Sequence, residues 1–247
     1  MVDEEKQQED FISTVSHELR TPLTSIRGFA QTMLGSWDLL DDENKKKFIQ
    51  IIEQQSNRLI NLVENMLSVN KLQSFNDKLV YKTASANILI EPIVQIIKHQ
   101  YPNHQIEEIF NNKIPYILVD VDKFQQIMTN LIENAAKYSN EGTKITVKTD
   151  FSANPDYVSI KVIDEGIGIK EEDFDKIFTK FSRLDNPLTR KVQGSGLGLY
   201  ISKTLIKKMG GGISVKSSEN GTIFEVLLPV ENVENQAIKP FKTTLSE

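Results

Sequence analysis

The first third of the chain carries apolar residues at alternating steps of three and four positions. This spacing lines one side of a helix and is typical of the seam between two packed helices. The pattern occurs twice, separated by the stretch SWDLLDDEN. The first set is Ile12, Val15, Leu19, Pro22, Ile26, Phe29 and Met33, and the second is Phe48, Ile52, Gln55, Leu59, Leu62, Met66 and Val69. The pattern predicts a helical hairpin.

The second stripe is wider than one partner helix can cover, because Ile51, Val63 and Leu67 extend it. A lone hairpin would leave this apolar surface in water, at a cost of about 25 cal/mol per Å². Dimerisation into a four-helix bundle would bury it, so we expect a homodimer. The alternative is that the stripe packs against the rest of the chain.

From about Leu79 the periodicity changes to short β-prone runs that alternate with helical stretches. The runs are YILVD, KITVKTD, YVSIKVID, GISVKS and TIFEVLLP, and the helical stretches are 87–100, 120–138 and 196–209. Such alternation predicts a layered α/β domain, in which Asp120 or Asp122 can cap the second of these helices. The tail after Pro229 is polar and aperiodic, and we expect it to be disordered.

The expected organisation is therefore a hairpin domain at 1–75, an α/β sandwich at 76–230 and a tail at 231–247. A length of 247 residues suits two modest domains. A net charge of −5 disfavours a nucleic-acid partner, and the lack of cysteine excludes disulfides and thiolate metal sites. No apolar run approaches the ~20 residues of a membrane span. We expect a cytoplasmic chain without a membrane segment, whose charged start MVDEEKQQED is typical of a fragment that follows sensor or membrane segments.

The stretch SHELRTPL places a histidine beside an acid. At 100° per residue, His17 lies about 200° from Val15 and about 160° from Leu19, so it faces solvent. Thr21 shares its face one turn later, and Pro22 removes a helical N–H donor and should bend or loosen the helix. An exposed imidazole that can give one proton to Glu18 is a candidate nucleophile, although an ordinary surface histidine fits these residues alone.

The other two histidines, His99 and His104, are five residues apart and have no companion ligands, so we expect no metal site there.

The stretch NLIENAAKYS offers groups that a magnesium nucleotide needs. Asn130 and Asn134 share a helix face and present amide oxygens that a hard cation accepts. Lys137 adds a positive charge for phosphate, and Tyr138 adds a ring for a base. A plain polar helix face is the alternative.

Two glycine-rich segments follow. In DEGIGI, Asp164 ends a strand and precedes Gly166 and Gly168, where the backbone can approach a ligand closely. In GSGLGLYISK, three glycines precede a helix and aim backbone N–H groups at phosphates, but their spacing differs from a dinucleotide fingerprint. These are Gly194, Gly196 and Gly198. Thr222 begins the closing strand.

The segment FDKIFTKFSRLDNPLTRKVQ lies between the two glycine segments. It combines the apolar anchors Phe178 and Phe181 with the cations Arg183, Arg190 and Lys191. This mixture is typical of a mobile lid that reaches phosphates.

In their order and spacing, SHELRTPL, NLIENAAKYS, DEGIGI, FTKFSRLD and GSGLGL resemble the H, N, G1, F and G2 boxes of the two-component sensor histidine kinases. The resemblance covers about residues 10 to 230. It implies a dimeric helical bundle that carries the histidine and an ATP-binding α/β sandwich of the kind shared with gyrase and MutL.

The resemblance also implies residue roles. His17 resembles the phospho-acceptor, Glu18 the general base, and Thr21 the residue that positions water for dephosphorylating a partner. Asn134 resembles the Mg²⁺ ligand and Asp164 the acceptor for the adenine amino group. Lys137 and Arg183 resemble phosphate contacts. The other residues that it assigns to ATP binding are Asn130, Tyr138, Gly166, Gly168, Gly194, Ser195, Gly196, Leu197, Gly198, Leu199 and Thr222.

The implied activity is autophosphorylation of His17 from ATP and Mg²⁺, followed by transfer to an aspartate of a response regulator receiver domain. Dephosphorylation of that regulator is a second implied activity, and 73–78 is the expected hinge. Two other readings compete with this one: a nucleotide-binding scaffold without phosphotransfer, and an ATP-driven clamp like gyrase and MutL. The intact His17, Glu18 and Asn134 argue against the first, and the helical hairpin that carries SHELRTPL argues against the second.

Overall fold

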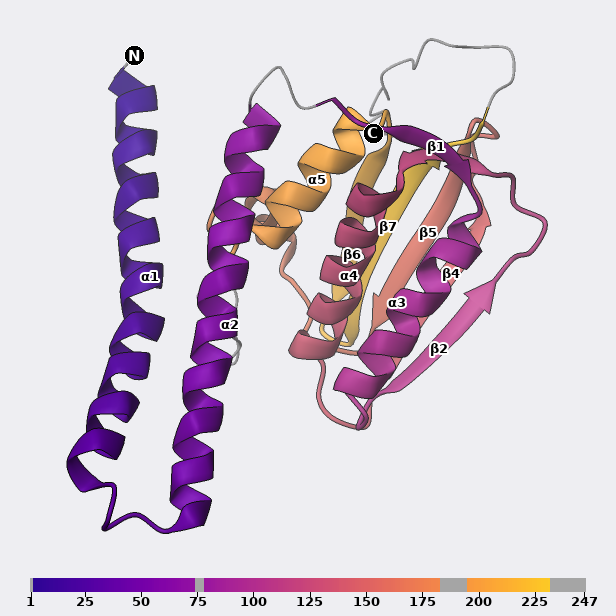
Figure 1. The fold of residues 1–247 in the computed structure, drawn as a ribbon. Helices are drawn as coiled ribbons and strands as arrows, with labels where there is room; N and C mark the ends of the chain where they lie inside the picture. Colours follow the sequence, from indigo (N-terminus) through magenta and orange to yellow (C-terminus); the bar gives the residue numbers. More distant parts are fainter. Residues whose placement is uncertain (1, 74–77, 183–194, 232–247) are drawn as a thin grey trace. The chain divides into compact units, whose positions relative to one another are not determined.

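A computed structural model of the 247-residue chain describes residues 2–73, 78–182 and 195–231. The chain separates into two compact units, Met1–Lys71 and Leu72–Glu247. The first unit is helical and the second contains all the strands (Figure 1). Within the described residues, no helix has the length and apolar character that a membrane crossing requires.

The first unit is the predicted helical hairpin. It consists of α1 (Val2–Ser36) and α2 (Asp42–Gln73), which run antiparallel (Figure 1). The rings of Phe29 and Phe48 meet across the hairpin with their centroids 5.1 Å apart, and Pro22 and Met33 on the same side of α1 are buried. Pro22 lies inside α1 without ending it. Proline cannot donate a backbone hydrogen bond there, and the bend or loosening expected beside His17 stays a prediction.

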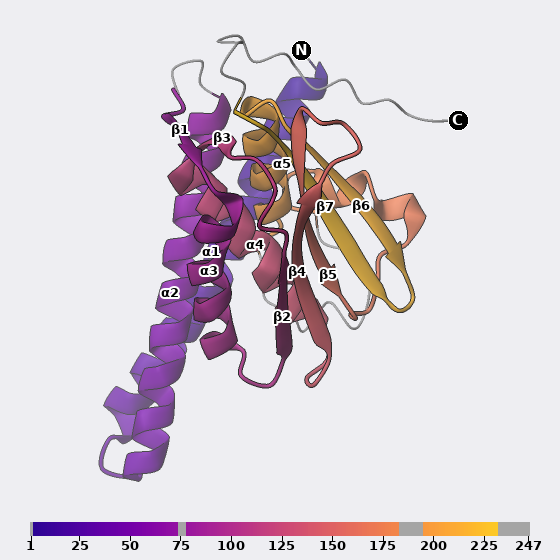
Figure 2. The same ribbon diagram turned by 90° about the vertical axis from the view of Figure 1, so that its right-hand side faces the viewer.

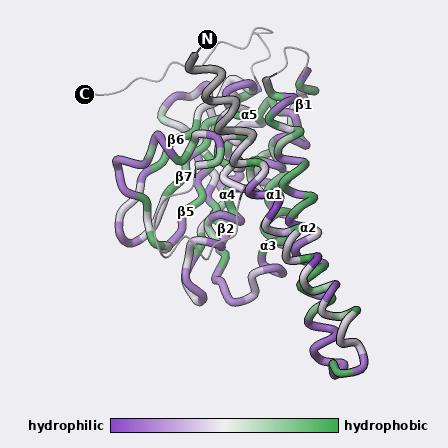
Figure 3. Tube along the Cα trace, turned by 90° about the vertical axis from the view of Figure 1, so that its left-hand side faces the viewer, coloured by the Kyte–Doolittle hydropathy of each residue, from purple (hydrophilic) through white to green (hydrophobic). Residues whose placement is uncertain are grey.

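The hairpin leaves part of its apolar surface exposed. Val63 and Leu67, which widen the second stripe, are 42% and 53% exposed. Hydrophobic positions recur along both helices between hydrophilic ones (Figure 3). Dimerisation into a four-helix bundle stays a prediction, and this exposed surface is what it would bury.

The second unit is a two-layer α/β sandwich. Its helices are α3 (Ala86–Gln100), α4 (Val121–Tyr138) and α5 (Gly198–Lys208). Its main sheet has the order β2-β4-β5-β7-β6, with the β2–β4 pair parallel and the other pairs antiparallel. These strands are β2 (Gln105–Phe110), β4 (Lys144–Phe151), β5 (Tyr157–Asp164), β6 (Gly212–Ser218) and β7 (Gly221–Pro229).

The three helices cover one face of the main sheet (Figure 2). The layer between helices and sheet is apolar, and Ile90, Phe124, Leu131, Ile160 and Leu205 are fully buried in it. A separate antiparallel pair joins β1 (Tyr81–Ala84) to β3 (Ile117–Asp120). Two short 3₁₀ helices, η1 (Glu171–Asp173) and η2 (Lys176–Phe178), follow β5 along the chain.

The predicted helices and the five predicted strands all form, but β1 and β2 were not predicted from the sequence. The β2 segment, QIEEIF, contains two glutamates, which are unusual in strands. It forms at the edge of the sheet, where Glu107 and Glu108 make ion pairs with Lys144 and Lys98. Edge position and cross-element charge pairs are tertiary features that alternation alone does not reveal.

Of the two candidate caps, Asp120 is the residue that caps α4. Its Oδ1 accepts a hydrogen bond from the backbone N–H of Lys123 at 3.2 Å, while its Oδ2 accepts one from Val80 at 2.9 Å. The expected hinge at 73–78 has its central residues 74–77 outside the described part of the chain, and the expected tail lies outside it from residue 232.

Candidate active site

His17 lies in the middle of α1 with its side chain 77% exposed, as the helical geometry predicts. Its Nδ1 lies 4.0 Å from Oε1 of Glu18, whose side chain is only 16% exposed. This separation is longer than a hydrogen bond, and such contacts commonly tighten when substrate binds. In the tautomer that carries its proton on Nδ1, facing the carboxylate, the Nε2 lone pair is available for attack.

Thr21 follows one turn after His17 and is exposed. Its Oγ1 donates a hydrogen bond to the backbone carbonyl of His17 at 3.3 Å. A hydroxyl that donates one hydrogen bond can still accept another, so Thr21 can interact with a water molecule beside His17.

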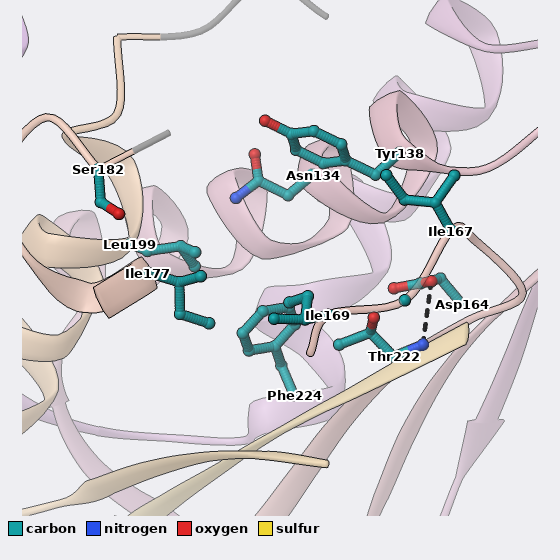
Figure 4. A pocket seen from close by; sticks show the side chains of 11 residues that line it. Asn134, Tyr138, Asp164, Ile167, Ile169, Ile177, Ser182, Leu199, Thr222 and Phe224 are labelled. Atoms are coloured by element: carbon teal, nitrogen blue, oxygen red, sulfur yellow. Dashed lines mark hydrogen bonds between the residues drawn. The ribbon is translucent and has the colours of Figure 1, made fainter. Parts of the chain in front are cut away.

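The second unit contains a cavity of about 630 Å³, measured with its open mouth (Figure 4). Its walls come from α4, the end of β5 and the loop after it, η2, the start of α5 and the start of β7. Most of the walls are apolar, with a few polar groups that converge on the space, which is the usual composition of a small-molecule site. The lining residues are Asn134, Tyr138, Asp164, Ile167, Gly168, Ile169, Ile177, Ser182, Leu199, Thr222 and Phe224.

Asp164 supplies the buried carboxylate of this cavity and is 7% exposed. Its Oδ1 accepts hydrogen bonds from the backbone N–H groups of Gly166 at 2.9 Å and Thr222 at 3.2 Å. Burial raises the pKa of Asp164 to about 6, and the two hydrogen bonds oppose that rise. The second carboxylate oxygen points into the cavity (Figure 4), where it can accept a hydrogen bond from an amino group.

The loop after Asp164 is held by close backbone approaches. Gly168 has φ +69°, and any side chain there would collide with the backbone of Ser218. Ser217 Oγ accepts a hydrogen bond from the N–H of Ile169 at 2.8 Å and donates one to the carbonyl of Gly221, also at 2.8 Å. The loop is therefore fixed to the β6–β7 hairpin, and this fixes the position of the carboxylate.

Among the described residues, no group of three or more histidine, cysteine, aspartate or glutamate side chains is placed to hold a metal ion. Asn134 offers one amide oxygen at the cavity (Figure 4). Magnesium in nucleotide sites typically takes one or two protein ligands and completes its shell with phosphate oxygens and water. The residues present fit that mode of binding.

Two family models match the chain. Residues 7–75 match the His Kinase A (phospho-acceptor) domain, and residues 119–232 match the histidine kinase-, DNA gyrase B-, and HSP90-like ATPase domain. The chain belongs to the sensor histidine kinases. In this histidine kinase core, His17 falls within the first match and every residue that lines the cavity falls within the second.

Similar curated proteins are longer sensor kinases. The sensor histidine kinase WalK of Bacillus subtilis is 34% identical over 233 residues, which are 91% of this chain and 37% of that protein. The sensor protein kinase WalK of Staphylococcus epidermidis is 33% identical over 237 residues, 94% of this chain and 38% of that protein. The chain thus spans less than two fifths of these relatives.

Solved structures share the fold. Histidine kinase ThkA in complex with response regulator protein TrrA matches with a TM-score of 0.72 and 27% identity, over 90% of this chain and 61% of the matched chain. Acinetobacter baumannii histidine kinase AdeS matches with a TM-score of 0.68 and 23% identity, over 87% of this chain and 98% of that one. The second match supports the fold alone.

The structure brings some of the predicted nucleotide residues to the cavity wall, whereas others do not line it. Asn134, Tyr138, Asp164, Gly168, Leu199 and Thr222 line the cavity, whereas Gly166, Ser195, Gly196, Leu197, Gly198, Asn130 and Lys137 do not. Asn130 donates to Ser202 Oγ at 3.0 Å, and Lys137 pairs with Glu133 at 2.6 Å. Arg183, Arg190, Lys191 and Gly194 lie outside the described residues.

Five lining residues were not predicted from the sequence: Ile167, Ile169, Ile177, Ser182 and Phe224. Two of them are the isoleucines of DEGIGI itself, where alternation of apolar residues with glycine was the available signal. Phe224 packs edge-on against Phe178, with ring centroids 6.3 Å apart. The predicted apolar anchor Phe178 therefore supports the cavity wall from behind.

Proposed function

We propose that this chain is the catalytic core of a protein histidine kinase that phosphorylates its own His17 from ATP. The observation that carries the proposal is the exposed His17 imidazole with its Nδ1 toward the mostly buried carboxylate of Glu18. The same chain holds a cavity whose buried acid suits a purine base. Phosphoryl transfer requires a nucleophile, a base that accepts its proton and a binding site for the phosphoryl donor.

The cavity suits ATP in one orientation. The adenine ring fits between the apolar walls formed by Ile169, Ile177 and Phe224, with its amino group donating to Asp164. The phosphates then extend toward Asn134 and the first turn of α5, where the backbone N–H groups of a helix start favour anions. Bound Mg²⁺, with Asn134 as its protein ligand, offsets phosphate charge.

The transfer step forms one bond and breaks one. The Nε2 lone pair of His17 attacks the γ-phosphorus, and the bond between that phosphorus and the bridging oxygen breaks, leaving its electron pair on ADP. The Nδ1 proton passes to Oε1 of Glu18, so the phosphorylated ring stays neutral. Glu18 and His17 are neighbours on one helix, so the base travels with the nucleophile.

The phosphohistidine would then donate its phosphoryl group to an aspartate of a response regulator. The similarity to ThkA, solved in complex with response regulator protein TrrA, supports this class of partner. A homodimer is part of the proposal, supported by the match to the phospho-acceptor domain and by exposed Val63 and Leu67. Because ATP and receiver domains are cytoplasmic, we propose that the core acts there.

A second activity, hydrolysis of the regulator's phospho-aspartate to release inorganic phosphate, is proposed for the same helix. Thr21 presents a hydroxyl one turn from His17 and can hold the attacking water.

The test is labelling with γ-labelled ATP and Mg²⁺. The wild-type chain should acquire a base-stable, acid-labile label, and His17→Gln should acquire none. His99→Gln, which changes an exposed histidine of the other unit, is the matched control and should label normally. Undiminished label on His17→Gln would refute the assignment.

A further inference from the structure

Arg58 on α2 reaches the proposed base from the opposite helix of the hairpin. Its Nη2 lies 3.3 Å from Oε2 of Glu18, forming a hydrogen-bonded ion pair between residues 40 positions apart. Both side chains are mostly buried, at 23% and 16% exposure. The second oxygen of the same carboxylate, Oε1, is the one directed at Nδ1 of His17. The Glu18 carboxylate thus lies between a guanidinium and the imidazole.

We propose that Arg58 is a positioning residue for phosphorylation of His17, acting by holding Glu18 so that Oε1 faces Nδ1. The inference rests on the proposed function and adds to it a residue outside the SHELRTPL segment. The contact that links Arg58 to the reacting groups is the one with Glu18, so its proposed effect passes through that carboxylate.

The physical argument is one of orientation. A glutamate side chain has three rotatable bonds, and His17 is an exposed neighbour that does little to restrict them. A contact from α2 to Oε2 selects the side-chain conformations that leave Oε1 beside the ring. Displacement of a reacting group by about an ångström can lower a rate about a hundredfold, so such selection matters to proton transfer.

A purely structural role for the pair is the competing explanation. Ion pairs with partial solvent access stabilise proteins little, and the hairpin has an apolar seam of its own that includes the Phe29–Phe48 contact. Loss of Arg58 should therefore change the stability of the hairpin much less than the rate of labelling.

The experiment is a double-mutant cycle on the full chain, with initial rates of His17 labelling measured over a range of ATP concentrations. Arg58→Gln should lower kcat about tenfold or more and leave KM for ATP unchanged. Arg58→Lys, which keeps the charge but not the planar fork, should recover part of the rate. In the Glu18→Gln background, Arg58→Gln should cause no further loss, because the group it positions is no longer a base.

Arg27→Gln, at an exposed arginine of α1, is the control and should label at the wild-type rate. Full activity of Arg58→Gln would overturn the inference. An equal loss of labelling rate in the wild-type and Glu18→Gln backgrounds would also overturn it, since the effect of Arg58 would then be independent of Glu18. A loss of labelling rate that is explained by a fall in Tm would overturn it too, because the role of Arg58 would then be structural. Failure of the proposed function looks different, because the wild-type chain would then carry no label on His17.

Discussion

Gly198, the first residue of α5, packs directly against the side chain of Asn130 on α4. A β-carbon at position 198 would collide with the amide oxygen of Asn130, and the amide nitrogen of the same residue donates to Ser202 Oγ at 3.0 Å. Asn130 therefore joins α4 to the first turn of α5. Asn130 thereby helps to place the helix that borders the cavity, and the nucleotide contact expected for it from the sequence stays a prediction.

Gly198→Ala should weaken ATP binding about tenfold while the α/β unit stays folded. The added methyl group must displace either Asn130 or the start of α5, and Leu199 on that turn lines the cavity. Calorimetric titration with ATP checks the affinity, and thermal unfolding checks the fold. Gly28→Ala, at an open position on α1, is the control and should bind ATP normally. Unchanged affinity in Gly198→Ala would show that the helix start does not influence the site.

Asp164→Asn should weaken ATP binding roughly ten- to a hundredfold, because a hydrogen bond to a charged, buried acceptor is worth about 1.5–3 kcal/mol. The exposed Asp156→Asn change on the same unit should leave the dissociation constant as it was. Calorimetric titration of both variants with ATP measures the two dissociation constants. An Asp164→Asn protein with wild-type affinity would move the adenine contact elsewhere.

ATP affinity should fall as the pH is lowered through about 6, the value to which burial raises the pKa of Asp164. Below its pKa the carboxyl group carries an O–H donor, and this oxygen accepts a hydrogen bond from the adenine amino group less well than an ionised oxygen does. The same protonation, taken alone, favours the folded protein. The folded pKa lies above the ordinary value of 3.8, so the folded state takes up the proton first and gains stability from this group on acidification.

The measurement for this pH dependence is calorimetry from pH 5 to 8 on the wild-type chain and on Asp164→Asn. Titration of the ATP phosphates affects both proteins equally, so the difference between the two profiles isolates Asp164. Parallel profiles would mean that another group controls the dependence.

Thr21→Ala should separate the two proposed reactions. Alanine suits a helix, and the hydrogen bond that the hydroxyl donates to the His17 carbonyl is long, at 3.3 Å, so autophosphorylation should stay near its wild-type rate. Removal of phosphate from the cognate regulator should slow about tenfold or more, the scale of one lost catalytic contact. Both rates are measured on one preparation with purified phospho-regulator. Equal losses would show that Thr21 supports the helix and has no part in holding water.

Local sequence pattern was sufficient to predict many of the helices, strands and loops of this protein. Apolar steps of three and four residues determined the hairpin and the outward direction of His17, because helical geometry converts spacing into a face without help from distant residues. Alternation identified five of the strands, and glycine-rich segments marked the loops that border the cavity. Each of these signals lies within a few residues of the structure that it describes.

Only the tertiary structure decided which of the predicted residues line the cavity and which contact other parts of the unit. Asn134 and Asn130 occupy the same helix face, yet one lines the cavity and the other binds Ser202 on α5. The pairing of Arg58 with Glu18 likewise joins residues 40 positions apart. Such contacts depend on how separate elements pack against each other. Periodicity along one segment predicts which of its faces is apolar, but it does not specify which other element that face meets.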